Sequence, residues 1–303
     1  MRDAILSFGE RLIRGAEGVQ AVSVPFRRII VCGMGGSSVP GELLSMARND
    51  VVVHWDYQLP HDTSPHDLVI CVSWSGNTAE TLSGYGAART LGAPLAVITT
   101  GGELARRAAA DGVQAVLLPA DAPAPRCGAA AMTGALFALL DMSDQLPRVS
   151  SPDLESEGQR IAREIGPRTP VFYAGYPLRK IAGFFKTMVN ENAKRHAWAA
   201  NFPSAEHNEL VGWQGDYRQH MAPVIIRGVA DEAYQKDFSA FIALLGEMGY
   251  TVSTTTVSGD TPLEAAINGY ALALWTSYHM AVSAEIDPLD TALIEKFKQL
   301  KTQ

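Results

Sequence analysis

The sequence lacks the features that mark secreted or membrane-embedded proteins. Its 303 residues include three cysteines, an odd number with wide spacing, which argues against a disulfide framework. Cys32 and Cys71 lie inside short apolar runs, so we expect buried, reduced thiols in a cytoplasmic protein. No apolar run reaches the roughly 18 residues of a membrane span. The opening stretch MRDAILSFGERLIRG carries charges throughout, which is typical of an amphipathic helix rather than a signal peptide.

Positive charge is scarce as well. The net charge is −7 and the basic residues are scattered, so neither a nucleic-acid nor a membrane partner is expected. The histidines do not form a metal-binding pattern, since His61 and His66 lie in a proline-rich loop and His207 has no second ligand at a convincing spacing. What the chain does have is apolar content: 47% of its residues are hydrophobic, enough for about two domains with sizeable cores.

Short apolar segments alternate with helix-length segments through the first half. Five segments rich in Val and Ile are predicted as buried strands, at 27–33, 51–55, 68–74, 94–100 and 114–119. Helices are predicted between them at 38–48, 78–91 and 102–110, followed by a further helix at 128–142. This alternation predicts an α/β domain with a mainly parallel, doubly wound sheet that is flanked by helices.

The second half repeats this scheme less regularly. The stretch DQLPRVSSPDLESEG breaks the pattern with proline, serine and charge, so a boundary is placed near residue 150, between domains 1–150 and 151–303. Strands are predicted at 169–175, 222–228 and 251–257. Helices are predicted at 177–194 and, as two long apolar segments, near 262–283 and 288–301. The sequence therefore predicts two domains of the same kind.

A loop rich in hydroxyl groups, SWSGNT, follows the third predicted strand. Ser73, Ser75 and Thr78 supply hydroxyl donors, and Gly76 permits close backbone approach, just where a helix N-terminus offers unpaired N–H groups. A single Ser or Thr at a helix start is usually only a cap. Three hydroxyls and a glycine within six residues favour a phosphate site, and the absence of a lysine favours a phosphomonoester over a nucleoside triphosphate.

A second loop, GMGGSS, follows the first predicted strand. Gly33 and Gly35 fit the dinucleotide motif GxGxxG, but its third glycine is replaced by Ser38. Asp56 lies about 20 residues further on, so an NAD-dependent dehydrogenase remains an alternative. In the other interpretation Gly35 and Gly36 let a ligand approach while serines donate hydrogen bonds. Since both loops follow strands of one predicted sheet, a single sugar-phosphate site is favoured.

These motifs together resemble a known family. GMGGSS with SWSGNTAETL resembles the sugar isomerase (SIS) domain. With VNENAK (189–194), FPSAEHNELVGW (202–213) and DPLDTALIEKFK (287–298), the chain from about residue 28 onward resembles the bifunctional phosphoglucose/phosphomannose isomerases. The resemblance implies two SIS domains, a homodimer, and interconversion of fructose 6-phosphate with glucose 6-phosphate and mannose 6-phosphate. It implies neither a metal nor an organic cofactor.

The resemblance also assigns roles to residues. It implies a phosphate site made by Ser37, Ser73, Ser75 and Thr78, with Gly35 and Gly36 giving room. Glu191 matches the catalytic base, and His207 matches a ring-opening residue that the partner subunit supplies. Arg126, Lys298 and Thr291 match further site residues, Thr291 being linked to mannose 6-phosphate. Two motifs depart from the family pattern: DPLDTAL lacks the usual Asp-Pro-Thr-Pro, and Glu206 replaces the commoner Asn.

The expected chemistry suits these residue types. Isomerisation moves a proton between adjacent carbons through a cis-enediol(ate), which needs a carboxylate base near the mouth of a sheet and a cation such as Arg126. A helix over 178–194 places Glu191 at the border of a buried stripe formed by Ile181, Phe184, Phe185, Met188 and Asn192. A border carboxylate, a loop histidine or a helix lysine is by itself more often a surface residue. A sugar-phosphate-binding SIS regulator and another SIS chemistry therefore remain alternatives to the isomerase.

Overall fold

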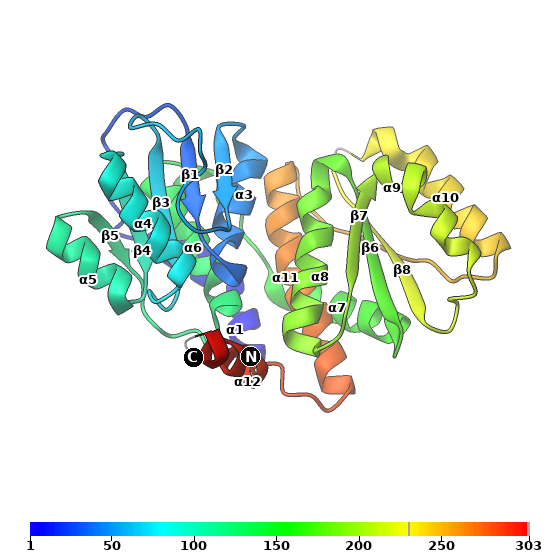
Figure 1. The fold of residues 1–303 in the computed structure, drawn as a ribbon. Helices are drawn as coiled ribbons and strands as arrows, with labels where there is room; N and C mark the ends of the chain where they lie inside the picture. Colours follow the sequence, from blue (N-terminus) through cyan, green and yellow to red (C-terminus); the bar gives the residue numbers. More distant parts are fainter. Residues whose placement is uncertain (230, 302–303) are drawn as a thin grey trace. The chain divides into compact units, whose positions relative to one another are not determined.

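The chain folds into two compact units that are each built around a parallel sheet. The structure is a computed structural model that describes residues 1–229 and 231–301. One unit, called the N-terminal unit, comprises Leu6–Val149. The other, the C-terminal unit, comprises Ser150–Gln303 together with Met1–Ile5. Figure 1 shows both units, which are described separately below.

The N-terminal unit contains a five-stranded parallel sheet in the order β2-β1-β3-β4-β5. The strands are β1 (Ile29–Cys32), β2 (Val51–His54), β3 (Leu68–Ser73), β4 (Leu95–Thr99) and β5 (Gln114–Leu117). The helices are α2 (Phe8–Ala16), α3 (Val39–Ala47), α4 (Ala79–Leu91), α5 (Gly102–Asp111) and α6 (Pro125–Leu139), with short 3-10 turns η1 (Gly35–Ser37) and η2 (Ser143–Gln145). Helices α4 and α5 pack on the face that bears Cys32 and Cys71, while α3 packs on the opposite face.

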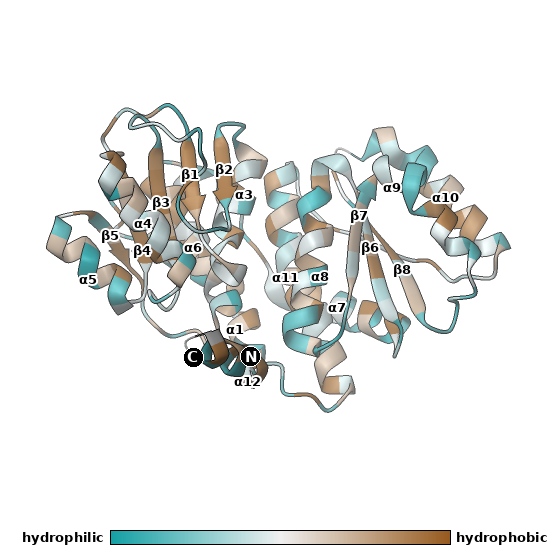
Figure 2. Ribbon diagram, viewed as in Figure 1, coloured by the Kyte–Doolittle hydropathy of each residue, from teal (hydrophilic) through white to brown (hydrophobic). Residues whose placement is uncertain are grey.

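The central strands of this sheet are apolar because both faces are covered. Every residue of β1 and β3 is buried, and both strands are hydrophobic along their length (Figure 2). The two outer strands differ from the prediction: β2 is only partly buried, and β5 alternates, with Leu117 64% exposed. The prediction of five buried strands was wrong for these two, because an edge strand has a neighbour on one side only.

The C-terminal unit contains a four-stranded parallel sheet in the order β7-β6-β8-β9. The strands are β6 (Thr169–Gly175), β7 (Trp198–Phe202), β8 (Met221–Arg227) and β9 (Ser253–Thr256). The helices are α1 (Arg2–Leu6), α7 (Ser151–Ile165), α8 (Arg179–Ala193), α9 (Ser204–Asn208), α10 (Gln235–Glu247), α11 (Pro262–Ser283) and α12 (Ala292–Lys301), with 3-10 turns η3 (Tyr176–Leu178), η4 (Leu210–Gln214) and η5 (Glu232–Tyr234).

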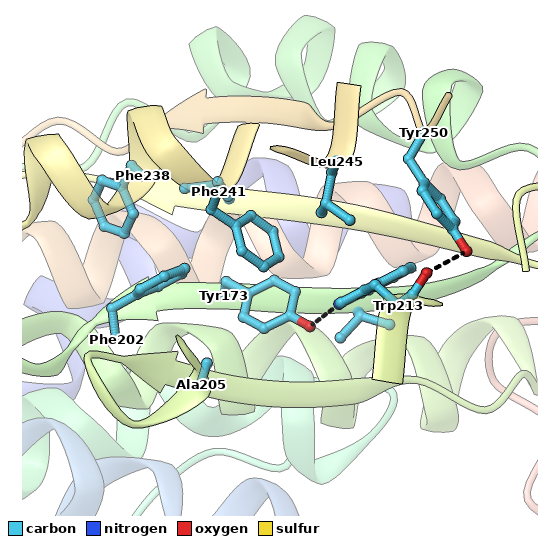
Figure 3. Close-up of a cluster of buried hydrophobic side chains, with 10 residues drawn as sticks. Tyr173, Phe202, Ala205, Trp213, Phe238, Phe241, Leu245 and Tyr250 are labelled. Atoms are coloured by element: carbon cyan, nitrogen blue, oxygen red, sulfur yellow. Dashed lines mark hydrogen bonds between the residues drawn. The ribbon is translucent and has the colours of Figure 1, made fainter. Parts of the chain in front are cut away.

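Two layers of helices cover this second sheet. On one face Phe172 packs against Phe185 of α8 with ring centroids 5.1 Å apart, and α11 packs against α7 and α8. On the other face an aromatic cluster joins β6 to α9, η4 and α10 (Figure 3). There Tyr173 lies beside Phe202 and Phe241, and Trp213 lies beside Tyr250. Because successive strand residues point to opposite faces, the neighbours Phe172 and Tyr173 serve different layers.

Both sheets are wound in the same way. The first strand lies inside the sheet, the second pairs on one side of it, and the third pairs on its other side. The order of strands therefore reverses between β1 and β3 in one unit and between β6 and β8 in the other, and ligands bind at such switch points in open α/β sheets. The predicted fold class, two doubly wound α/β units with parallel sheets, is confirmed.

Several elements differ from the predictions. Helix α7 begins within the stretch interpreted as a break, because Pro152 stands in a first turn, where its missing N–H is harmless. Strand β7 and helix α10 were not predicted. The last helix begins at Ala292 rather than 288, and its residues from Ala292 to Leu300 are exposed. All three cysteines are buried and free. None of the helices in the described ranges is long and apolar enough to cross a lipid bilayer.

Candidate active site

The two predicted loops meet at the switch point of the N-terminal sheet. Strands β1 and β3 pair in register, with Cys32 opposite Cys71, so the loops that follow them leave the same edge. The hydroxyl of Ser37 in the first loop accepts a hydrogen bond of 3.0 Å from the backbone N–H of Trp74 in the second. This bond is buried and holds the two loops together. The prediction that both loops face one place is thus met by their geometry.

The hydroxyl loop has a fixed internal arrangement. The hydroxyls of Ser73 and Thr78 lie 2.9 Å apart, and the backbone N–H of Gly76 donates to Ser73 Oγ at 3.1 Å. Ser73 is buried, whereas Ser75 is exposed at the tip of the loop, where its Oγ accepts from the N–H of Asn77 at 3.3 Å. Gly76 has a φ of +69°, and a Cβ there would collide with the carbonyl of Gly101, so glycine is required.

The capping interpretation applies to a different helix. Thr78 precedes α4, but among the described residues its side chain makes no capping hydrogen bond to that helix. Asn77 instead accepts from the backbone N–H of Glu103 at 3.0 Å, in the first turn of α5. The N-terminus of α4, with its partial positive charge, therefore follows a loop whose hydroxyls are not used as its caps. This arrangement is suited to a phosphate.

Arg126 lies beside the first loop. Helix α6 begins at Pro125, not at residue 128 as predicted, because proline is well tolerated in a first turn. A Cβ on Gly36 would lie 2.5 Å from Arg126 N and 2.7 Å from Arg126 Cα, so Gly36 lets the two backbones touch. Arg126 itself is buried, with 2% of its surface exposed. The structure thus brings Gly36, Ser37 and Arg126 together at one edge of the sheet.

The dinucleotide alternative finds little support in this loop. Ser38, at the position of the third glycine, is buried and donates its hydroxyl to the carbonyl of Gly35 at 2.8 Å. Asp56 uses a carboxylate oxygen to accept from the N–H of its neighbour Tyr57 at 2.7 Å. Both side chains that a nucleotide site would employ are engaged in local turns.

Glu191 lies in the last turn of α8 in the C-terminal unit. The five residues predicted to form the buried stripe of this helix are buried, and Glu191 is partly exposed at its border, as predicted. The sequence interpretation expected Glu191 near the mouth of a sheet, which is its carboxyl edge. In the C-terminal sheet this prediction was wrong, because Glu191 lies at the opposite, amino edge. Arg195, just after α8, donates to the carbonyl of Gly166 at 2.9 Å, before β6 begins. A helix that follows a parallel strand runs back along the sheet, so its last turn lies at the amino edge.

The segment before the last helix approaches the end of α8. Lys194 Nζ donates to the carbonyl of Glu191 at 2.5 Å and contacts that of Pro288 at 3.5 Å. Thr291 follows in this segment and is partly buried. Lys298, seven residues further along in α12, is exposed and forms a surface ion pair of 2.8 Å with Glu295. The contacts therefore bring Thr291's segment towards Glu191, while Lys298 lies on a solvated helix face.

His207 is presented to solvent on a short helix rather than in the predicted loop. Its side chain is 78% exposed, and Nε2 lies 3.5 Å from a carboxylate oxygen of Glu206. The helix is α9, which is followed directly by η4. Two hydrogen bonds of 3.1 Å anchor that turn: Tyr173 donates to Glu209, and Trp213 donates to the Tyr173 hydroxyl. The sequence interpretation missed this anchor because strand β6 and the turn lie 36 residues apart.

The carboxyl edge of the C-terminal sheet is closed by a side chain. Strand β6 ends at Gly175, where a Cβ would collide with Oδ1 of Asp231. Asp231 Oδ2 accepts from the N–H of Gly228 at 2.7 Å, whereas Oδ1 is buried and has no hydrogen-bond partner within residues 1–229 and 231–301. Burial raises the pKa of Asp231 to about 6. Among the described residues, this edge has no counterpart of the hydroxyl loop.

No three His, Cys, Asp or Glu side chains within the described part of the chain are arranged to hold a metal ion.

The predicted site residues fall into two groups, one in each unit. Gly35, Gly36, Ser37, Ser73, Ser75, Thr78 and Arg126 belong to the N-terminal unit, and Glu191, His207, Thr291 and Lys298 belong to the C-terminal unit.

Comparisons with known proteins give a consistent result. The model of the family "Bacterial phospho-glucose isomerase C-terminal SIS domain" matches residues 154–300. A bifunctional phosphoglucose/phosphomannose isomerase from Pyrobaculum calidifontis is 30% identical over 317 residues, covering 99% of each chain. A D-glucosamine-6-phosphate 4-epimerase from Sulfolobus acidocaldarius is 33% identical over 214 residues, covering 66% of this chain and 68% of its own. A glucose-6-phosphate isomerase-like protein from Thermus thermophilus shares the fold, with a TM-score of 0.63, 18% identity and coverage of 99% and 98%.

Proposed function

The chain belongs to the bifunctional phosphoglucose/phosphomannose isomerase family, and on that premise we propose that it is an aldose–ketose isomerase of hexose 6-phosphates. It would interconvert fructose 6-phosphate with glucose 6-phosphate and with mannose 6-phosphate. The observation that carries this proposal is the pair of loops joined by the Ser37–Trp74 hydrogen bond at the switch point of the N-terminal sheet.

The phosphate would be held by neutral hydroxyls and by backbone N–H groups. Ser37, Ser73, Ser75 and Thr78 provide the hydroxyls, and the N-terminus of α4 provides the amides and a favourable dipole. The Ser73–Thr78 contact pre-orients two of these groups, so little rotamer entropy remains to be lost on binding. Ser75 is exposed and can turn to the ligand, and the exposed backbone at Gly35 leaves room for it, whereas Gly36 lies against the backbone of Arg126.

Glu191 would transfer the proton. Its carboxylate would remove the proton from C2 of the aldose and return it to C1, or the reverse, through a cis-enediol(ate). Glucose 6-phosphate and mannose 6-phosphate share this intermediate, and they differ only in the face on which C2 is reprotonated. No electron leaves the sugar, so the proposal invokes neither a metal nor an organic cofactor. Arg126 would stabilise the negative charge that develops on the enediolate oxygens.

The remaining residues would act at the ends of the sugar. His207 would move the ring-oxygen proton during ring opening, a task suited to an imidazole, whose two ring nitrogens can donate and accept protons. Thr291 would contact the C2 region that distinguishes mannose from glucose, and Lys298 would add positive charge. We further propose a homodimer in which His207 serves the partner subunit's site. The proposal requires groups of both units to reach one sugar phosphate.

The test is an assay with fructose 6-phosphate in the presence of EDTA and without added cofactor. Glucose 6-phosphate and mannose 6-phosphate are quantified separately, and both should appear. If fructose 6-phosphate stabilises the protein but is not converted, the isomerase proposal is wrong and the protein is a sugar-phosphate-binding regulator. Activity that requires a metal or NAD would contradict the proposed chemistry.

A parallel assay with glucosamine 6-phosphate addresses the epimerase relative. That substrate should remain unchanged at C4, because Glu191 is proposed to act between C1 and C2. Inversion at C4 without turnover of fructose 6-phosphate would overturn the proposal in favour of an epimerase.

A further inference from the structure

A second cavity lies within the C-terminal unit. Its volume is about 310 Å³, which is within the range of small-molecule sites, and none of the residues given a role in the proposed reaction lines it. It covers the amino half of the sheet, where Trp198 at the start of β7 pairs in register with Val171 of β6. The cavity opens on the face that bears Tyr173, opposite the face on which α8 carries Glu191. It is therefore separate from Glu191, and His207, which lies on α9 two residues before Glu209, does not line it.

Aromatic rings form most of its wall. Tyr173 and Trp213 line the cavity and are buried, and Figure 3 shows the hydrogen bond that joins them. Trp198 and Tyr217 form its rim, and they are 59% and 44% exposed. Large aromatic side chains are costly to expose, and a group of them around a concavity marks a binding site rather than a core. The face of an aromatic ring attracts cations through its negative electrostatic potential.

A single charge completes the wall. Glu209 is the only charged side chain among the described residues that line the cavity. Its Oε2 accepts from the hydroxyl of Tyr173 at 3.1 Å, and that hydroxyl accepts from Trp213 Nε1, so the phenol is fixed as a donor. Burial raises the pKa of Tyr173, which keeps it neutral. The neighbouring Arg218 is paired with Asp216 at 2.8 Å. The lining thus carries one negative charge, which would repel a sugar phosphate.

We propose that this cavity binds a small organic cation of the quaternary ammonium type. The carboxylate of Glu209 would offset its charge, and the rings of Trp198, Trp213 and Tyr217 would surround its methyl groups. A compact, weakly hydrated cation suits this lining better than a neutral polar molecule, which would leave its own hydrogen-bonding groups unpaired against aromatic walls. The proposal is independent of the isomerase reaction, since neither substrate nor turnover enters it.

Choline and 3,3-dimethylbutan-1-ol provide the test, because they share a shape and differ only in charge. Their dissociation constants are measured on the whole protein by ligand-observed NMR titration. Choline should bind more tightly by roughly five- to thirty-fold, the range expected for one or two partly exposed cation–π contacts. Glu209→Gln should reduce this difference without abolishing it, because the aromatic contacts remain, and its amide oxygen can still accept from Tyr173. Glu206→Gln, a change of equal charge outside the cavity lining, should leave it unchanged.

The contradicting results are equally specific. Equal affinity for the two compounds would show a merely apolar hollow, and no measurable binding of choline would eliminate the site. If Glu206→Gln weakened choline as much as Glu209→Gln, the effect would be one of net charge, and the site would again be rejected. A second variant, Trp198→Leu, should weaken choline more than its neutral analogue. Each variant's melting temperature is recorded, so that a loss of binding is not confused with a loss of fold.

Discussion

The two sheets of this protein share a winding order but end differently at their carboxyl edges. At the switch point of the N-terminal sheet, a loop of hydroxyl groups precedes α4, and Gly36 and Gly76 let neighbouring backbone segments pack closely around it. At the switch point of the C-terminal sheet, Asp231 fills the corresponding place above Gly175. One edge presents donors to solvent, and the other is closed by a buried carboxyl group. The strand order therefore provides a switch point in both sheets, but the residues at each edge determine whether a ligand can bind there.

This difference indicates a division of labour between the units. The proposed phosphate-binding groups lie at the carboxyl edge of the first sheet, whereas Glu191 lies at the amino edge of the second, in the last turn of α8. Because Asp231 fills the carboxyl edge of the second sheet, the groups proposed for this unit lie on its helices and at helix ends instead. Binding and proton transfer should then respond to different substitutions.

The largest effect is expected for Glu191→Gln. The variant keeps the size of the side chain but removes the base, so turnover should fall by about a thousandfold, within the range for loss of general-base catalysis. Binding of fructose 6-phosphate, measured by calorimetry, should change by less than about threefold, because the proposed phosphate groups are untouched.

Glu247→Gln is the matched control for this change. Glu247 is also the acidic residue in the last turn of a helix of the C-terminal unit, α10, and it has no proposed role. Its turnover should equal that of the unmodified protein. Normal isomerisation by Glu191→Gln would remove Glu191 as the base, and a joint loss of binding and turnover would contradict the division of labour.

A second effect concerns stability and a different buried carboxylate. Asp67 precedes β3 at the amino edge of the N-terminal sheet, is fully buried, and accepts from Arg27 at 2.8 Å and Arg28 at 3.1 Å. The hydrogen bond from Arg27 lowers the pKa of Asp67 to about 2. A depressed pKa stabilises the fold above the unfolded value of about 4, and this stabilisation is lost as the pH falls through about 2.

Asp67→Asn should therefore cost about 2 kcal/mol of unfolding free energy at pH 7, and the deficit should shrink below pH 4. Urea unfolding at several pH values measures it. Asp62→Asn removes a partner of Arg28 whose side chain is 73% exposed, and it should cost clearly less than Asp67→Asn does. A deficit for Asp67→Asn that stays constant down to pH 2 would show that packing, not charge, is lost.

The parts of the site that the sequence predicted well are local in the chain. A buried strand, the hydroxyls of Ser73 and Thr78, and the start of α4 lie within about a dozen residues, so strand, loop and helix determine each other's positions. Gly36 and Arg126 show the limit of this reasoning. They are 90 positions apart, and only the folded chain reveals that a Cβ at one would touch the backbone of the other.

Errors arose where an element's surroundings, rather than its own pattern, decide its state. The pattern of β5 was interpreted as a buried strand, but its position at the sheet edge leaves Leu117 exposed. The last helix has apolar residues at helical spacing, yet Leu293 is 82% exposed. For Glu191, the apolar stripe of α8 correctly predicted that the residue lies at the border of a buried face. The stripe does not show in which direction the helix runs along its sheet, and this direction puts Glu191 at the amino edge.

A smaller effect should sharpen the contrast between the two carboxyl edges. Ser75→Ala removes the exposed hydroxyl of the loop, so KM for fructose 6-phosphate should rise by about tenfold, the cost of one hydrogen bond to a charged group, while kcat changes little. Ser239→Ala on α10, whose hydroxyl donates only to the carbonyl of Gln235, should alter neither. If KM stayed unchanged in Ser75→Ala while the protein remained active, this residue would have no part in phosphate binding.

The last effect concerns the stability of Asp231→Asn at the closed edge. Burial raises the pKa of Asp231 to about 6, so the folded state binds its proton more tightly than the unfolded state does. Stability from this group is complete below about pH 4 and is lost as the pH rises through about 6. Asparagine does not titrate, and its carbonyl can still accept from the N–H of Gly228.

Relative to the unmodified protein, the unfolding free energy of Asp231→Asn should therefore gain roughly 2 kcal/mol between pH 4 and pH 7.5. Thermal unfolding of both proteins at the two pH values measures this shift, and parallel behaviour would contradict the buried, protonated carboxyl. Fructose 6-phosphate should raise both melting temperatures equally, since the proposal assigns it to the other edge. If fructose 6-phosphate raised the melting temperature of Asp231→Asn less than that of the unmodified protein, the closed edge would take part in binding. The contrast between the two carboxyl edges would then be wrong.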